Sequence, residues 1–319
     1  MSQTSEILNA IVPEAAAGKR LDQALSLMFS NYSRARLQQW IKLGRVTVEN
    51  QQRRAKDKVY LGESIVMQVE ADVEVVWQPE AIPLDILYED EDIIVINKPV
   101  GLVVHPAPGH ETGTLSNALL HHVPQVENLP RAGIVHRLDK DTSGIMVAAK
   151  SLSAHHALVA SLQAREISRD YIALVYGEST AGATIDAPIG RHKADRKRMA
   201  VLSELDSTAK HAVTHYRIRQ RFVGYTLLDV KLETGRTHQI RVHMAYIHSP
   251  IVGDPVYGGR VKIPKNCSEE TRLAVQHFKR QALHAHQLTL EHPSTHEVMS
   301  WQAPLADDIE QLLLKLEAK

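Results

Sequence analysis

Charge along this chain is segregated, although its 319 residues carry 37 basic and 37 acidic side chains and no formal net charge. Between Gly18 and Tyr60 there are ten Lys or Arg residues against three acids, whereas Glu70 to Asp92 holds nine acids and no Lys or Arg. A basic module followed by an acidic segment favours two domains, as does a length above the ~100–200 residues of one domain. The basic block suits contacts to a phosphate backbone and is also compatible with a solvated surface.

The basic block has the apolar spacing of two helices followed by two strands. The stretches "RLDQALSLMF" (20–29) and "SRARLQQWIKLG" (33–44) are typical of helices, and "RVTVEN" (45–50) and "ESIVMQV" (63–69) are typical of short strands. Arg34, Arg36 and Lys42 would lie off the apolar face, and together with Arg20 they are the expected RNA contacts. The ordered pieces "GKRLDQAL", "SRARLQQWI" and "GRVTVEN" resemble the ribosomal protein S4-like domain, which implies a small α/β RNA-binding domain.

Residues 71–83, "ADVEVVWQPEAIP", have the composition of a linker, because prolines and acids discourage a helix or a central strand. We therefore predict a first domain over residues 1–75, which includes the start of the linker, and a second over 76–319. The second mixes helical and strand patterns without the regular alternation of a doubly wound sheet, which favours an α+β fold on a mixed, largely antiparallel sheet. Predicted strands are 92–99, 144–150, 169–177, 213–221, 226–234 and 286–292; predicted helices are 115–122, 153–167, 237–248 and 305–319.

The stretch "GIVHRLDKDTSGIMVAAK" (133–150) places a dense charge cluster directly before an apolar strand. A carboxylate on a turn beside Arg137 and Lys140 would stay ionised at neutral pH, because nearby cations favour its charged form. Such a group can act as a nucleophile or a base. The residues alone do not choose between Asp139 and Asp141, and a surface ion-pair turn explains the same letters.

Several classes of protein are disfavoured by what the sequence lacks. No apolar run reaches the ~18–20 residues of a membrane span, and the N-terminus has no signal-peptide pattern, so we expect a soluble cytoplasmic protein without a membrane partner. Cys267 is the only cysteine, which excludes an intrachain disulfide. The 18 histidines lack the spacing of a metal site, and no nucleotide-binding glycine motif occurs, so we expect neither a metal nor a cofactor.

An ordered set of segments in the second domain resembles the RluA family of pseudouridine synthases. The segments are "NKPVGLVVHP" (97–106), "GIVHRLDKDTSGIMVAAK" (133–150), "RDYIALVYG" (169–177), "LETGRTHQIRVHMAYIHSPIVGDPVYG" (232–258) and "QALHAHQLTLEHP" (281–293). The resemblance implies the family's catalytic fold and the isomerisation of uridine to pseudouridine in RNA. That reaction requires no redox cofactor, nucleotide or metal.

The resemblance also implies roles for individual residues. Asp139 matches the catalytic aspartate, Tyr171 the active-site tyrosine and Arg241 the basic partner of the aspartate. The tyrosine would lie against the uracil ring and take the proton from carbon five, for which its phenol must be strongly activated, since its ordinary pKa is ~10. Arg137 would fill the base stack once the target base has flipped out. Ile240 would form the apolar pocket floor, and Arg236 and His238 would be further substrate-binding residues.

With the N-terminal domain, the resemblance implies action on 23S rRNA, in the loop of helix 69, with 23S rRNA or a large-subunit precursor as the partner. We expect no required protein partner, and a monomer by default. A second basic run, "GRHKADRKRMAV" (190–201), predicts an exposed RNA-binding loop. Its expected contacts are Arg191, Lys193, Arg196, Lys197 and Arg198. Two alternatives stay open: a non-catalytic RNA-binding or assembly factor with the same fold, and a synthase that modifies tRNA.

Overall fold

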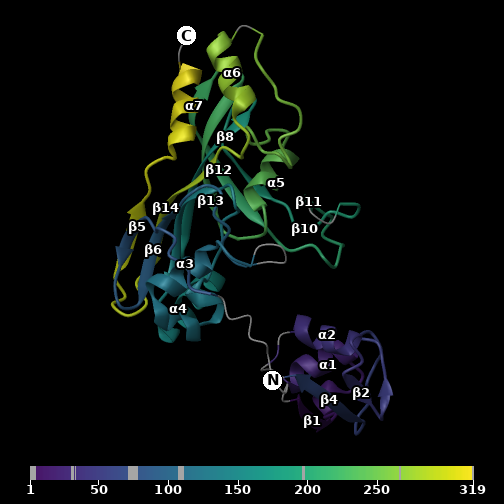
Figure 1. The fold of residues 1–319 in the computed structure, drawn as a ribbon. Coiled ribbons are helices and arrows are strands. Elements are labelled where there is room, and N and C mark those ends of the chain that lie inside the picture. Colours follow the sequence, from purple (N-terminus) through teal and green to yellow (C-terminus); the bar gives the residue numbers. More distant parts are fainter. Residues whose placement is uncertain are drawn as a thin grey trace. The chain divides into compact units, whose positions relative to one another are not determined.

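The chain divides into two units, Met1–Val76 and Trp77–Lys319 (Figure 1). The computed structural model describes residues 5–29, 32, 34–70, 78–106, 111–195, 198–265 and 267–317. The predicted domain boundary between residues 75 and 76 stays a prediction, because residues 71–77 lie outside the described ranges. Each unit has its own buried apolar core and is described by itself.

The first unit packs two helices against a sheet in the order β1-β4-β2-β3. The helices face the sheet through buried Leu21, Leu25, Leu37 and Trp40, which recur at the intervals that put side chains on one helical face. Both predicted helices and both predicted strands are confirmed, whereas β1 and β3 were not predicted. The elements are β1 (Ser5–Ile11), a 3₁₀ helix (Glu14–Ala16), α1 (Leu21–Met28), α2 (Arg34–Lys42), β2 (Val46–Val48), β3 (Gln51–Gln52) and β4 (Ser64–Glu70).

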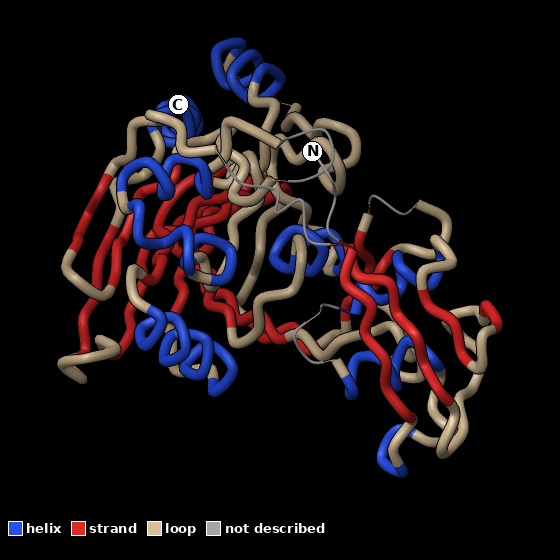
Figure 2. Tube along the Cα trace, turned by 60° about the horizontal axis from the view of Figure 1, so that its bottom comes forward, coloured by secondary structure: helices blue, strands red, loops and turns tan. Residues whose placement is uncertain are grey.

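The second unit is built on one large sheet in the order β5-β6-β7-β14-β8-β13-β12-β9, with β15 paired to β14 (Figures 1 and 2). Among the strand pairs that the described residues form in this sheet, only β7–β14 is parallel, which confirms the predicted mixed, largely antiparallel sheet. The strands are β5 (Ile86–Glu89), β6 (Ile93–Lys98), β7 (Ser143–Ala149), β8 (Ser168–Tyr176), β9 (Ala183–Asp186), β12 (Val213–Phe222), β13 (Tyr225–Leu232), β14 (Leu283–Glu291) and β15 (Val298–Gln302).

Helices cover both faces of the central strands. On β6, Ile94 and Ile96 join the core that includes α3, whereas Ile93 and Val95 join the core that includes α4. Because successive side chains on a strand point to opposite faces, a strand covered on both sides is apolar throughout. The helices are α3 (Leu115–His122), α4 (Leu152–Ala164), α5 (Gln239–Tyr246), α6 (Glu269–His277) and α7 (Asp307–Glu317), with 3₁₀ helices at Pro124–Asn128 and Pro130–Gly133.

All the helices and strands predicted for the second unit are confirmed, and several elements were missed. The missed elements are α6, β5, β9, β15 and the hairpin of β10 (Ile189–Arg191) and β11 (Met199–Val201). That hairpin corrects the expected loop at 190–201, because the two ends of the basic run pair with each other as strands.

The close approach of β14 to β7 depends on Gly144, the glycine that ends the "HRLDKDTSG" stretch. Its φ is +110°, and a Cβ at this position would lie 2.1 Å from the carbonyl oxygen of Ala285 on β14. No residue with a side chain fits there without moving backbone. The glycine therefore allows β14 to enter the sheet directly beside the turn that carries Asp139.

Candidate active site

The turn between residues 139 and 142 is held from behind by two buried cations. Lys98, at the end of β6, donates to the carbonyl oxygen of Lys140 at 3.0 Å, and Arg280 donates to that of Asp141 at 3.2 Å. Lys98 also donates to two more carbonyls, at 2.8 and 3.1 Å. Burial lowers the pKa of Lys98 to about 8. Since charge-assisted hydrogen bonds are the strong ones, the backbone beside Asp139 is firmly placed.

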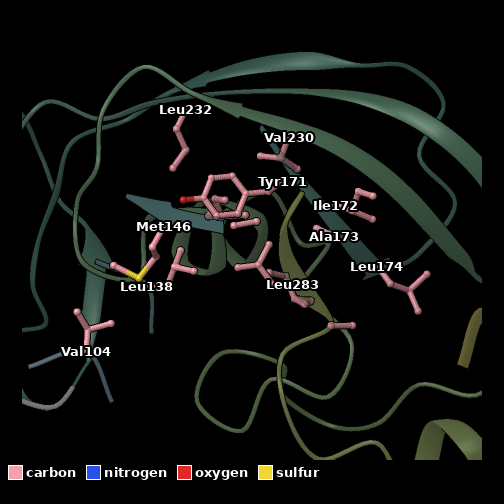
Figure 3. Packing of buried hydrophobic residues seen from close by; sticks show 14 of the residues in the cluster. Val104, Leu138, Met146, Tyr171, Ile172, Ala173, Leu174, Val230, Leu232 and Leu283 are labelled. Atoms are coloured by element: carbon pink, nitrogen blue, oxygen red, sulfur yellow. The ribbon is translucent and has the colours of Figure 1, made fainter. Parts of the chain in front are cut away.

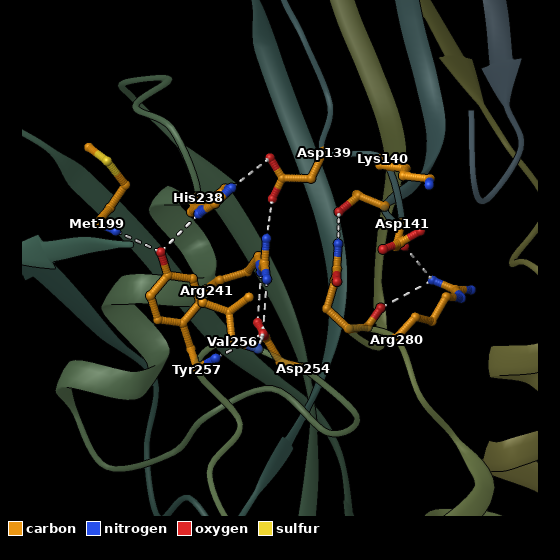
Figure 4. A network of polar contacts seen from close by, with 12 residues as sticks. Asp139, Lys140, Asp141, Met199, His238, Arg241, Asp254, Val256, Tyr257 and Arg280 are labelled. Atoms are coloured by element: carbon orange, nitrogen blue, oxygen red, sulfur yellow. Dashed lines mark hydrogen bonds and ion pairs between the residues drawn. The ribbon is translucent and has the colours of Figure 1, made fainter. Parts of the chain in front are cut away.

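Asp139 and Arg241 meet across 102 residues of sequence, and the contact extends to a second carboxylate (Figure 4). Arg241 donates from Nη1 to Asp139 Oδ2 at 2.8 Å, from Nε to Asp254 Oδ2 at 2.7 Å and from Nη2 to Asp254 Oδ1 at 2.9 Å. The Arg241 side chain is 5% exposed and that of Asp254 is fully buried, whereas that of Asp139 is 17% exposed. The carboxylate of Asp254 thus orients the guanidinium, and the carboxylate of Asp139 is accessible to solvent.

Asp254 keeps its charge in spite of its burial. Burial alone would raise the pKa of this carboxyl, but the hydrogen bonds and charge of Arg241 hold it below its ordinary value. The backbone N–H groups of Val256 and Tyr257 also donate to Asp254, at 2.8 and 3.0 Å. The two carboxylates likewise raise the pKa of Arg241, against the effect of its burial. Asp254 and Arg241 therefore form a stable buried ion pair.

His238 lies at the edge of these charged groups, at the start of α5. Its backbone is left-handed, with φ 57°, and its Nε2 is 3.8 Å from Asp139 Oδ1. Its Nδ1 is 2.8 Å from the hydroxyl of Tyr257, which also accepts a hydrogen bond from the backbone of Met199 on β11. Burial lowers the pKa of His238 more than the charge of Asp139 raises it. The neutral imidazole is therefore the favoured form of His238 beside the carboxylate.

Tyr171 projects from β8 into the apolar part of the site. Figure 3 shows its ring among buried side chains that include Leu138 and Leu283. Burial raises the pKa of Tyr171, and the charge of Asp139 adds to that rise, although Arg169 opposes it. A raised pKa keeps the phenol protonated, so the strong activation expected for a base is not found in this arrangement.

A cleft of about 850 Å³ brings the expected catalytic and substrate-binding residues together. Its lining combines apolar side chains, of which Ile240 is 4% exposed, with several arginines. Arg236 donates to the backbone carbonyl of His211 at 3.0 Å, whereas Arg137 is exposed. All seven of those residues line the cleft: Arg137, Asp139, Tyr171, Arg236, His238, Ile240 and Arg241.

The RNA contacts expected in the first unit are only partly available to a ligand. Arg20 pairs with the fully buried carboxylate of Asp22 at 3.1 Å. The guanidinium of Arg36 lies 4.7 Å from the ring centre of Trp40, whereas Lys42 is exposed. Arg34 lies in α2, and its side chain is outside the described part of the chain.

The basic run of the second unit lies on the β10–β11 hairpin. Arg191 is exposed at the end of β10, and Lys193 has an 81% exposed side chain that is 3.7 Å from Asp206. Arg198 stacks over the ring of Tyr257 at 5.4 Å, which links the hairpin to the active site. Arg196 and Lys197 lie outside the described residues.

Sequence reasoning missed four residues that support the site: Lys98, Asp254, Tyr257 and Arg280. Lys98, Asp254 and Tyr257 lie within the segments "NKPVGLVVHP" and "LETGRTHQIRVHMAYIHSPIVGDPVYG", which carry the family resemblance. The resemblance therefore pointed to these segments, but the sequence did not show which residues these three contact. Arg280 carries no local signal. Its bond to Asp141 joins residues 139 positions apart.

Two features are missing from the described residues. No group of three or more His, Cys, Asp or Glu side chains among them is arranged to hold a metal ion. Of the helices in the described part of the chain, none is long and apolar enough to cross a membrane.

Comparisons with known proteins match both units. The family described as RNA pseudouridylate synthase matches residues 92–246, and the S4 domain matches residues 19–65. The "Ribosomal large subunit pseudouridine synthase D" of Pseudomonas aeruginosa is 54% identical over 304 residues, which cover 95% of this chain and 94% of that protein. The protein of the same name from Escherichia coli K12 is 52% identical over 312 residues, covering 98% and 94%.

A solved structure shares the fold. "Human RNA Pseudouridylate Synthase Domain Containing 4" superimposes with a TM-score of 0.58 at 26% identity, over 73% of this chain and 92% of that one.

Proposed function

The chain belongs to the RNA pseudouridylate synthase family, and from this premise we propose that it isomerises uridines of large-subunit ribosomal RNA to pseudouridine. Family membership makes it an RNA pseudouridine synthase. The observation that carries the proposal is the carboxylate of Asp139, which opens into the cleft while Arg241 holds it at 2.8 Å. Two further donors of that guanidinium, on Nε and Nη2, bind Asp254.

Two observations support a ribosomal substrate. The relatives that match nearly the whole chain are named for the large ribosomal subunit, and residues 19–65 match the S4 domain. We infer that the substrate is 23S rRNA, in the large subunit or its precursor, and that the target uridines lie in the loop of helix 69. In this proposal the enzyme acts in the cytoplasm as a monomer and supports maturation of the large subunit.

The reaction rearranges one nucleotide without a second substrate. The bond between N1 of uracil and C1′ of the ribose breaks, the base rotates, and C5 bonds to C1′. A proton leaves C5 and another arrives at N1, so the number of atoms and the charge are unchanged. The protein must therefore supply a group that acts on the sugar, a pocket that retains the free base, and a path for the proton.

Asp139 is the group that acts on the sugar in this proposal. Attack on the ribose and acceptance of a sugar proton both require an ionised carboxylate, and Arg241 orients that carboxylate by a charge-assisted hydrogen bond. Arg241 is thus a positioning residue for Asp139, and Asp254 in turn orients Arg241. Lysine would serve less well at this position, because only the planar guanidinium can bridge two carboxylates in a fixed geometry.

The retained base would lie against the ring of Tyr171, on an apolar floor that includes Ile240. Such a pocket suits a planar ring that must rotate without leaving. A base can reach it only after it leaves the RNA stack, which costs a few kcal/mol. Arg137 stands exposed at the cleft, where it can take the place of the missing base, while Arg236 and His238 contact the target nucleotide.

A chemical map of pseudouridine in large-subunit rRNA tests the proposal. The map is made in cells that lack this protein and in the same cells complemented by the wild type or by Asp139→Asn. We expect sites that disappear in the deletion and return only with the wild-type protein. An unchanged rRNA map would contradict the ribosomal substrate, and a loss of sites in tRNA would point to the tRNA synthase. Restoration by Asp139→Asn would exclude Asp139 as the reacting group and favour an assembly factor.

A further inference from the structure

Arg169 is a buried arginine in the cleft that the proposed mechanism does not use. It lies two residues before Tyr171 on β8, and both residues line the cleft. Side chains two positions apart on a strand share a face, so the guanidinium points to the same side of the sheet as the Tyr171 ring. Only 8% of Arg169 is exposed.

The guanidinium of Arg169 has no protein partner among the residues that the structure describes. Its Nε is buried without a hydrogen-bond acceptor, and none of those residues forms an ion pair with it. Two other cleft arginines differ: Arg165 pairs with Glu233 at 3.0 Å, and Arg236 donates to a backbone carbonyl. A buried charge without a partner is costly to fold, so a role in the folded protein alone does not explain it.

The loop opposite β8 leaves room for this side chain. A Cβ on Gly235 would lie 2.7 Å from Nη1 of Arg169, so any larger residue there would displace the guanidinium. The backbone thus accommodates a planar cationic group whose own hydrogen bonds are not satisfied. A guanidinium has five N–H donors, and those of Arg169 make no hydrogen bond to a described residue.

We propose that Arg169 binds a phosphate group of the RNA strand, one of those flanking the uridine that enters the cleft. A phosphodiester carries a negative charge that would balance the buried guanidinium. Its two non-bridging oxygens also match the two parallel N–H donors of the guanidinium. Uracil is neutral and would leave the charge uncompensated. The inference rests on the proposed function, because it names a contact between that same site and its RNA.

The contact positions the target nucleotide. A phosphate held beside Tyr171 fixes the strand at the depth where the ribose lies near Asp139. The exposed arginines and lysines elsewhere follow the backbone loosely, since exposed ion pairs contribute little and are screened by salt. Arg169 is therefore a substrate-binding residue.

The test compares Arg169→Met with Arg272→Met. Arg272 is a matched control, because it lies exposed on α6, pairs with Glu269 and carries the same single charge. The probe is a transcribed 23S rRNA fragment that the wild-type enzyme modifies. We expect Arg169→Met to raise the Kd about tenfold or more and to reduce the slope of log Kd against log salt by roughly 0.7, whereas Arg272→Met changes neither.

Neutral backbone linkages identify the contact. A methylphosphonate replaces each phosphate flanking the target uridine in turn. At one position it should weaken binding of the wild type about tenfold but weaken binding of Arg169→Met less than twofold, because the variant has already lost that contact. Arg169→Lys, which keeps the charge without the fork, should regain part of the affinity and most of the salt slope.

Thermal unfolding separates binding from a structural role. Since the unpaired charge is removed, Arg169→Met should melt at the wild-type temperature or above it. A lower melting temperature, or methylphosphonate losses that are equal in both proteins at every position, would overturn the inference. A loss of turnover at saturating RNA with unchanged Kd would overturn it too, because Arg169 would then act on the base. If the wild-type enzyme forms no pseudouridine in rRNA, it is the proposed function that fails.

Discussion

Two buried arginines line the same cleft and differ in what they touch. Arg241 makes three hydrogen bonds to two carboxylates, whereas no described residue accepts one from the guanidinium of Arg169. Both are cationic and nearly inaccessible, at 5% and 8% exposure. Burial and charge alone therefore do not separate a residue that serves the protein's own geometry from one that is kept for a ligand. The difference lies in how many donors the folded chain has already used.

The largest expected effect concerns the carboxylate that Arg241 holds. Asp139→Asn keeps the shape of the side chain but removes its charge, so turnover should fall by roughly a thousandfold or more. Binding of RNA should change little, because the contact of Arg169 is untouched. Turnover is measured as pseudouridine formation in a single-turnover assay, and RNA affinity is measured by equilibrium binding.

Asp141→Asn is the matched control for that substitution. The backbone carbonyl of Asp141 accepts a hydrogen bond from Arg280, and this carbonyl is unchanged in the variant. Its turnover should stay within about threefold of the wild type, since a half-buried polar turn residue that is placed by its backbone contributes little side-chain packing. An inactive Asp141→Asn beside an active Asp139→Asn would show that the other carboxylate reacts.

The contrast between Arg241 and Arg169 can be tested by replacing each of them with an apolar residue. Arg241→Leu leaves Asp254 as a buried charge without its partner, which should lower the free energy of unfolding by about 3–5 kcal/mol. Arg169→Met should lower it by nothing measurable. Urea unfolding of the two variants measures both changes. Equal losses would mean that Arg169 has a structural partner after all.

Lys98 extends the comparison to the cations behind the turn. With a pKa of about 8, its ammonium donates to three carbonyls at pH 7, but the neutral amine above pH 8 has only two donors. Turnover should therefore decline on the alkaline side with a midpoint near pH 8. Lys98→Met should be about tenfold slower at pH 7 and should lack this decline.

The alkaline decline is not expected to reflect unfolding. Folding lowers the pKa of Lys98 from its ordinary ~10.4, so above pH 8 the unfolded chain binds more protons at this group than the folded one. The contribution of this group to the free energy of unfolding therefore rises between pH 8 and about 10. A melting temperature that falls across the same window in the wild type but not in Lys98→Met would contradict this explanation.

The smallest effects are expected from the basic residues of the hairpin, of which Arg191 and Lys193 are exposed and Arg198 is half-buried. Changing Arg191, Lys193 and Arg198 together to Gln should weaken RNA binding severalfold and flatten its salt dependence by up to about 2 in slope. The melting temperature should stay within a few degrees of the wild-type value. Three exposed arginines elsewhere, Arg217, Arg219 and Arg272, provide a control of equal charge. Unchanged binding at every salt concentration would remove the hairpin from the RNA-binding surface.

Local patterns were enough to predict the elements, because apolar spacing depends on neighbours in sequence. The helix at Gln239–Tyr246 and the strands at Ile93–Lys98 and Ser143–Ala149 follow from such spacing and from burial on one or both faces. Short edge elements such as Ala183–Asp186 were missed, since four residues carry too little periodicity to stand out.

The site could be predicted only where a resemblance supplied the partners. Nothing near Asp139 in the sequence indicates Arg241, and charge alone left Asp139 and Asp141 equivalent. The structure distinguishes them, because one side chain meets a guanidinium at 2.8 Å and the other belongs to a residue held by its backbone. No sequence pattern predicts that Arg169 is unpaired. Its state depends on the absence of hydrogen-bond acceptors from all the described elements that surround its guanidinium in the fold.

The position of β14 in the sheet has a consequence for the order of events during synthesis. This strand, Leu283–Glu291, is inserted between β7, which follows the Asp139 turn, and β8, which carries Tyr171. Until the ribosome has made and released it, no strand pairing among the described residues joins the two halves of the sheet. Contacts so distant in sequence form slowly and late. In a nascent chain the first unit can therefore fold while the cleft is still unassembled. The chain can then bind RNA through its first unit before it is able to modify RNA.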